Sequence, residues 1–207
     1  TSDSDNNIGI GFKAGKGSSG NGTFVGHEAG MGGAGGAAGG VAFGYQAMST
    51  NVAGLYNTAL GYQALTTNNS GDGNTATGYQ ALKASTGDAN TASGHSSLSK
   101  NTSGSYNTSS GYLALETNTT GNNNTAVGAY ALFSNTTANQ NVAVGKEALY
   151  SNTTGYSNFG LGVNALYANT SGYNNTAVGT DSLRYNTTGF GNVAVGTEAL
   201  KSNTTGK

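Results

Sequence analysis

The sequence contains no cysteine, no proline and no tryptophan, and it carries few charges. Without cysteine the chain can form neither disulfides nor thiolate metal sites. Charged residues make up 8% of the 207 residues, and the eight Lys and Arg residues are spread over the whole length. No basic patch is therefore present to neutralise phosphates, and the composition argues against nucleic-acid binding.

Long apolar runs are missing as well. No run approaches the ~20 residues that span a bilayer, so we expect no membrane contact by this segment. Glycine, in contrast, accounts for 36 residues, and aromatic residues make up 9% of the chain. Disordered chains usually combine high net charge with few aromatics, whereas the formal net charge here is −1. The composition therefore favours an ordered but unusual architecture.

A 17-residue unit repeats along the chain, with the consensus N-T-A-V-G-x-x-A-L-x-x-N-T-T-G-x-x. The copy from Asn124 to Gln140 shows it well. Its fifth residue is a glycine in every copy, and most successive glycines are 17 residues apart. The twelve motif glycines are Gly11, Gly26, Gly44, Gly61, Gly78, Gly94, Gly111, Gly128, Gly145, Gly162, Gly179 and Gly196.

This unit predicts an all-β fold. Glycine, Asn and Thr are weak in helix interiors, and the segments between turns are too short for helices. The N-T-A-V-G segment alternates as a strand does, A-L-x-x fits a second short strand, and N-T-T-G supplies turn residues. We therefore expect a parallel β-solenoid with one coil per 17-residue repeat and about twelve coils.

Stacked coils would align two apolar ladders, both expected inside the coil. The second-strand ladder contains Met48, Leu65, Leu82, Leu98, Leu115, Leu132, Leu149, Leu166, Leu183 and Leu200. The first-strand ladder contains Ile10, Val25, Phe43, Leu60, Val127, Val144, Leu161, Val178 and Val195. In the middle copies the first-strand position is polar, with Thr77, Ser93 and Ser110. Those residues represent either drift in a narrow coil or a hydrated stretch on the axis.

The chain divides by regularity into residues 1–40, which hold atypical glycine-rich first repeats, and residues 41–207, which hold regular repeats. The glycine tract from Gly30 to Gly40 has no following helix that would bind a phosphate, so we expect a widened turn or a flexible excursion there. Each coil has a small apolar core, and ordering 17 residues opposes folding. Several chains packed side by side would bury a second face, which predicts oligomerisation.

The motifs Asn124–Gly128, Asn141–Gly145 and Asn192–Gly196 resemble the head repeats of trimeric autotransporter adhesins of the YadA type. The A-L and N-T-T-G variants look like repeats of phage tail-fibre and bacterial surface-fibre proteins. The similarity covers essentially the whole chain. It implies a left-handed β-roll, a homotrimer, and an extracellular location on a cell surface or virion fibre. The usual family unit is shorter than 17 residues, so each coil here has a longer turn.

Catalytic and metal-binding patterns are sparse. His27 and His95 lie at variable positions that we expect to face outward, and zinc needs three or four converging ligands. Among the carboxylates, only Asp3 and Asp5 form a closely spaced pair, so acid–base hydrolysis has no constellation to use. We therefore expect no cofactor and no enzymatic activity. The recurring Asn-Thr-Thr sequons at Asn118 and Asn135 are first of all turn residues.

The variable pair after each motif glycine should lie on an outer face and carry candidate surface-binding residues. One aromatic file follows the motif glycine, and a second follows N-T-T-G. Exposed aromatic ladders suit carbohydrate or surface binding, although they also stack well in β-structure. The candidates are Tyr45, Tyr62, Tyr79 and Tyr112 in the first file, and Tyr156, Tyr173 and Phe190 in the second.

These observations predict a non-enzymatic structural and adhesive segment of a trimeric surface or viral fibre. It would present a repetitive surface to a host cell, a glycan or another surface. The alternative is an ice-binding β-solenoid, suggested by regular files of Thr and Asn. Ice-binding arrays commonly place Thr-x-Thr on one strand, whereas most Thr pairs in this sequence lie together in a turn.

Overall fold

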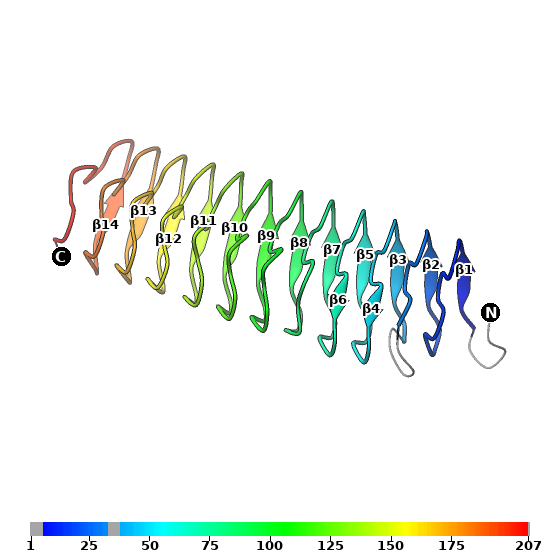
Figure 1. Cartoon of the computed structure of the whole chain (residues 1–207). Helices are drawn as coiled ribbons and strands as arrows, with labels where there is room; N and C mark the ends of the chain where they lie inside the picture. Colours follow the sequence, from blue (N-terminus) through cyan, green and yellow to red (C-terminus); the bar gives the residue numbers. More distant parts are fainter. Residues whose placement is uncertain (1–5, 33–37, 207) are drawn as a thin grey trace.

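The computed structural model describes residues 6–32 and 38–206, and throughout these residues the chain forms strands and turns without a helix. Twelve short parallel strands form one sheet along a rod, with β1 at one end and β14 at the other (Figure 1). Two further strands form a small second sheet. The strands of the large sheet are β1 (Ile8–Ile10), β2 (Thr23–Val25), β3 (Val41–Phe43), β5 (Thr58–Leu60), β7 (Thr75–Thr77), β8 (Thr91–Ser93), β9 (Thr108–Ser110), β10 (Thr125–Val127), β11 (Val142–Val144), β12 (Phe159–Leu161), β13 (Thr176–Val178) and β14 (Val193–Val195).

The strand register repeats with the sequence. Each strand pairs with the same segment of the next copy, so that Ala126 of β10 lies beside Ala143 of β11 and Val127 beside Val144. One coil is therefore built from each 17-residue unit, and the predicted parallel β-solenoid is confirmed. Like residues stack on like residues along the rod, which lets one favourable contact recur in every coil.

In each three-residue strand the central residue points into the coil, and the two flanking residues point outward. The central alanines, such as Ala126, Ala143 and Ala177, are fully buried. The predicted inward ladder of Val and Leu on the first strand is wrong, because Leu60, Val127 and their equivalents lie on the outer face or are only half-buried. The alternation of side chains along a strand shows that adjacent residues face opposite sides of the sheet, but it does not show which side is the interior. The coil is narrow, and alanine leaves room for the leucine that enters from the opposite wall.

That leucine ladder is inside as predicted: Leu132, Leu149 and Leu166 are fully buried. The A-L-x-x segment, however, is not a second strand in most copies but a tight turn. The buried leucines have positive φ, 53° at Leu149, and this left-handed backbone cannot continue a strand. On this side of the coil the described residues form one pair of strands, β4 (Thr50–Asn51) with β6 (Thr67–Asn68), and an isolated bridge between Thr67 and Ala84.

Two asparagine ladders complete the interior; the sequence indicated the first only as turn residues and the second only as the start of the strand segment. In the first, Asn118 donates from Nδ2 to Asn101 Oδ1 at 2.8 Å and to the Gly121 carbonyl at 3.0 Å. In the second, the Asn141 backbone N–H donates to Asn124 Oδ1 at 3.0 Å, and Asn141 Nδ2 donates to the Gly155 carbonyl at 2.8 Å. Each amide thus satisfies backbone groups that burial would otherwise leave unpaired.

Candidate ligand-binding surface

The outer face of the twelve-stranded sheet exposes large apolar side chains at both ends of the rod. Near the N-terminus the exposed residues include Ile8, Ile10, Phe43 and Leu60. Towards the C-terminus, strands β10 to β14 expose Val127, Phe159, Leu161, Val193 and Val195. In the middle, strands β7 to β9 place only Thr and Ser on this face. The polar residues Thr77, Ser93 and Ser110 therefore lie on the outside of the coil and not on its axis.

A file of stacked aromatic rings runs beside this sheet, just after the strands. Tyr45, Tyr62 and Tyr79 stack with ring centroids 5.2 Å apart, because each coil contributes one ring. His27 and His95 extend the same file, and both lie outward as predicted. Tyr112 ends the stacked part, since its ring meets that of Tyr130 edge-on at 77°.

The second aromatic file lies on the turn before the strands. The Tyr156 and Tyr173 ring centroids are 4.9 Å apart, and those of Tyr173 and Phe190 are 4.7 Å apart. The structure thus places the seven predicted residues in two separate groups, at opposite ends of the strands. Rings inside a stack have both faces covered, so a ligand would meet mainly their edges and hydroxyl groups.

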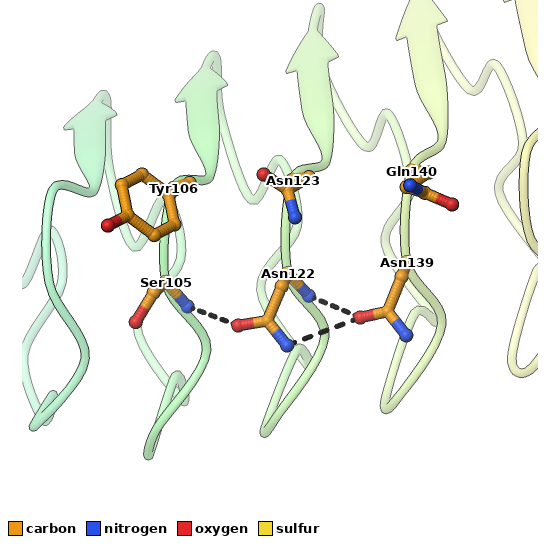
Figure 2. A pocket seen from close by; sticks show the side chains of 6 residues that line it. All are labelled: Ser105, Tyr106, Asn122, Asn123, Asn139 and Gln140. Atoms are coloured by element: carbon orange, nitrogen blue, oxygen red, sulfur yellow. Dashed lines mark hydrogen bonds between the residues drawn. The ribbon is translucent and has the colours of Figure 1, made fainter.

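A surface hollow of about 410 Å³ lies on the turns that lead into β9, β10 and β11. Figure 2 shows its lining of one aromatic ring and five hydroxyl or amide side chains. The ring belongs to Tyr106, which is 64% exposed and has no ring partner among the described residues. The lining residues are Ser105, Tyr106, Asn122, Asn123, Asn139 and Gln140.

Hydrogen bonds between coils fix the floor of this hollow (Figure 2). The Ser105 backbone N–H donates to Asn122 Oδ1 at 2.8 Å, and the Asn122 backbone N–H donates to Asn139 Oδ1 at 2.7 Å. Tyr106, Asn123 and Gln140 each follow one of the floor residues Ser105, Asn122 and Asn139 in the sequence, and their φ angles are between 58° and 61°. The arrangement combines a fixed amide row with outward-pointing side chains.

This hollow was not predicted from the sequence, because the candidate positions were those at which aromatic residues recur from copy to copy. The position of Tyr106 is glycine or a small or amide residue in most copies, including Gly73, Ala89 and Asn123. A large ring in a file of small residues was the available signal. Which side chains surround that ring depends on the stacking of coils.

No Asp, Glu, His, Lys or Arg lines the hollow, and the groups with perturbed pKa values lie elsewhere. A hydrogen bond from Gln46 lowers the pKa of Glu28, and one from Asn164, helped by Arg184 and Lys201, lowers that of Asp181. Loss of hydration raises the pKa of Tyr130. Within the described residues, no three His, Cys, Asp or Glu side chains come together as a metal site. Asp3 and Asp5 lie outside the described residues, as does part of the glycine tract, residues 33–37.

The sequon asparagines Asn118 and Asn135 are fully buried in the first asparagine ladder. Asn135 Nδ2, the atom that would carry a glycan, donates to Asn118 Oδ1 at 2.8 Å. The folded coil therefore closes both sites to glycosylation, whatever the compartment.

Comparison with known proteins gave no relative: no protein-family model, curated protein or solved structure matches the chain. Over the described residues, the structure contains no helix long and apolar enough to cross a membrane. The surface itself therefore provides the functional argument.

Proposed function

We propose that this chain is a non-enzymatic structural and adhesive segment of a trimeric surface or viral fibre. It acts outside the cell and presents its repeated surface to a host receptor, a glycan or another surface. The observation that carries the proposal is the outer face of the sheet. There, strands β1, β3 and β5 at one end and β10, β12 and β14 at the other expose large apolar side chains that a single chain leaves in water, on either side of the polar strands β7 to β9. Such a face is typical of an interaction surface.

Self-association fits this face because it is periodic. Two or more copies of the same rod have the same spacing between coils, so apolar rows such as Val127, Val144 and Leu161 can meet in register along their length. Three copies would bury the face on all of them around a common axis, which closes the assembly. The resemblance of the N-T-A-V-G motifs to trimeric adhesin heads supports the same stoichiometry.

Attachment is tested by incubating the fluorescently labelled chain with bacterial and mammalian cells, before and after periodate oxidation of their surface glycans. The proposal predicts saturable binding to at least one cell type. Loss of binding after periodate would indicate a glycan receptor, and retained binding a protein receptor. Absence of saturable binding to every cell type would contradict the adhesive role.

An ice-binding solenoid is the second candidate, and one structural observation favours it. Strands β7, β8 and β9 place Thr75 and Thr77, Thr91 and Ser93, and Thr108 and Ser110 side by side on the outer face. Three neighbouring strands thus carry the outward Thr-x-Thr or Thr-x-Ser pattern that is otherwise rare in the sequence. Thermal hysteresis of the purified chain separates the candidates: the fibre proposal predicts none, and ice binding requires it.

A further inference from the structure

We infer that the hollow around Tyr106 is a binding site for a neutral oligosaccharide, which locates the glycan contact of the proposed adhesive function and rests on that function. A saccharide of this class has uncharged hydroxyl groups and apolar ring faces. The hollow offers partners for both. The hollow, about 410 Å³, is open to solvent, so a ligand would lie along it rather than be enclosed.

The Tyr106 ring has the accessibility that the stacked files lack. The same position holds Ala89 in the preceding coil and Asn123 in the next, so no aromatic ring covers Tyr106 from either side. In contrast, the Tyr62 ring has Tyr45 and Tyr79 at 5.2 Å on its two faces. An apolar sugar face can therefore pack on Tyr106 but not on an interior ring of the file.

The amide row supplies fixed hydrogen-bonding groups. Asn122 Nδ2 donates to the Thr120 carbonyl at 3.0 Å and to Asn139 Oδ1 at 3.3 Å, which holds both side chains in place. Within the described residues, Asn139 Nδ2, the Asn123 side-chain amide and Gln140 Nε2 have no protein partner. The Asn139 side chain is held in place, so its free Nδ2 costs little ordering on binding, and the unpaired Asn123 amide and Gln140 Nε2 beside it add further partners for a hydroxyl-rich ligand.

The row continues towards a second aromatic platform. Tyr156 occupies the position of Asn139 in the following coil, and only one of its faces is stacked, on Tyr173. Tyr106 lies three coils before Tyr156, and at the spacing of parallel strands the two residues are ~14 Å apart along the rod. The distance suits an oligosaccharide that runs along the turns rather than a single sugar.

The site is tested with the whole chain and three neutral trisaccharides: maltotriose, cellotriose and N,N′,N″-triacetylchitotriose. Isothermal titration calorimetry gives each Kd, and saturation-transfer NMR detects weaker binding. We expect at least one trisaccharide to bind, with about tenfold loss of affinity in Tyr106→Ala and in Asn123→Gly. Glycine suits the positive φ of Asn123, so this second variant removes the amide without straining the backbone.

Tyr56→Ala is the matched control. Tyr56 occupies the same position in its coil and is 71% exposed, but Asp72 and Gly73 stand beside it where Asn122 and Asn123 stand beside Tyr106. The inference predicts an unchanged Kd for Tyr56→Ala. Failure of all three trisaccharides to bind would overturn the site, as would an unchanged Kd in Tyr106→Ala or equal losses in both tyrosine variants.

These outcomes separate the site from the proposed function. If no trisaccharide binds but the chain forms trimers and attaches to cells, the Tyr106 site is wrong and the fibre proposal stands. If Tyr106→Ala loses trisaccharide binding while the chain is a monomer that attaches to no cell, the site stands and the fibre proposal fails.

Discussion

At the scale of single residues, burial in the coil decides which substitutions matter. Leu149 is fully buried between Leu132 and Leu166, whereas Glu147, two residues earlier, is partly exposed and pairs with Lys146 at 3.3 Å. Leu149→Asp would bury a carboxylate without a partner, and we expect it to lower the free energy of unfolding by more than about 4 kcal/mol. Glu147→Ala should cost within about 0.5 kcal/mol. Urea denaturation followed by circular dichroism measures both, and equal tolerance would contradict the assignment of inside and outside.

The buried hydroxyl group of Ser182 lacks a hydrogen-bond partner among the described residues. Ser182 stands in the alanine ladder between Ala165 and Ala199. Ser182→Ala should therefore raise the free energy of unfolding, by about 1 kcal/mol. Ser97 is the control in the same ladder, because its Oγ donates to Ser109 Oγ at 2.7 Å. Ser97→Ala should destabilise the chain in the same urea titration, and stabilisation by both changes would contradict the hydrogen-bond assignment.

Asp181 links stability to pH. Hydrogen bonding from Asn164, with Arg184 and Lys201 nearby, holds its pKa below the ordinary value. A carboxyl group with a lowered folded-state pKa stabilises the fold above its unfolded pKa of about 3.9, and this contribution is lost as pH falls through the folded pKa. Asp181→Asn should therefore reduce the loss of unfolding free energy between pH 6 and pH 3. Identical losses in the two proteins, measured by urea denaturation, would contradict this assignment.

At the scale of the element, close contact between successive coils explains the motif glycine. A Cβ built on Gly145, where φ is 133°, would lie 2.5 Å from the carbonyl oxygen of Gly162 in the next coil. Gly196 has a similar φ of 123°, yet a Cβ there meets no described atom within 4 Å. Both changes to alanine strain the backbone, but only Gly145→Ala also forces two coils apart.

We therefore expect Gly145→Ala to lower the free energy of unfolding by at least about 2 kcal/mol more than Gly196→Ala. Thermal unfolding followed by circular dichroism ranks the two variants. Equal melting temperatures would mean that backbone conformation alone, and not contact between coils, requires the motif glycine.

The elements also show what the sequence could and could not predict. The period predicted one coil per repeat, and the leucine ladder followed from the most regular apolar position. Whether Val127 faces inward or outward could not be predicted. Alternation shows only that neighbouring residues face opposite sides, and it does not give the width of the coil. The left-handed backbone of Leu149 is not predictable from leucine, which rarely adopts it. The stacking of residues 17 apart was predicted, but the hollow around Tyr106 also depends on the positive φ of Tyr106, Asn123 and Gln140, which the repeat does not indicate.

At the scale of the whole molecule, the proposed trimer requires that copies of the chain cover the outer face of the sheet. Val127 is 39% exposed on this face, beside Ser110 and Val144 on the adjacent strands. If copies of the chain meet there, Val127→Asp should dissociate the assembly while leaving the coil folded, since the new carboxylate points away from the leucine ladder. Leu149→Asp, in contrast, should unfold the coil itself. Circular dichroism of the dissociated Val127→Asp chain checks that its β-structure remains.

Sedimentation equilibrium of the purified chain tests the central proposal most directly. The monomer has a mass of 20.5 kDa, and three copies give about 61 kDa. The account predicts the larger mass for the wild-type chain and a shift towards 20.5 kDa for Val127→Asp. A wild-type chain that sediments at 20.5 kDa, with full β-structure and a cooperative melting transition, would contradict it.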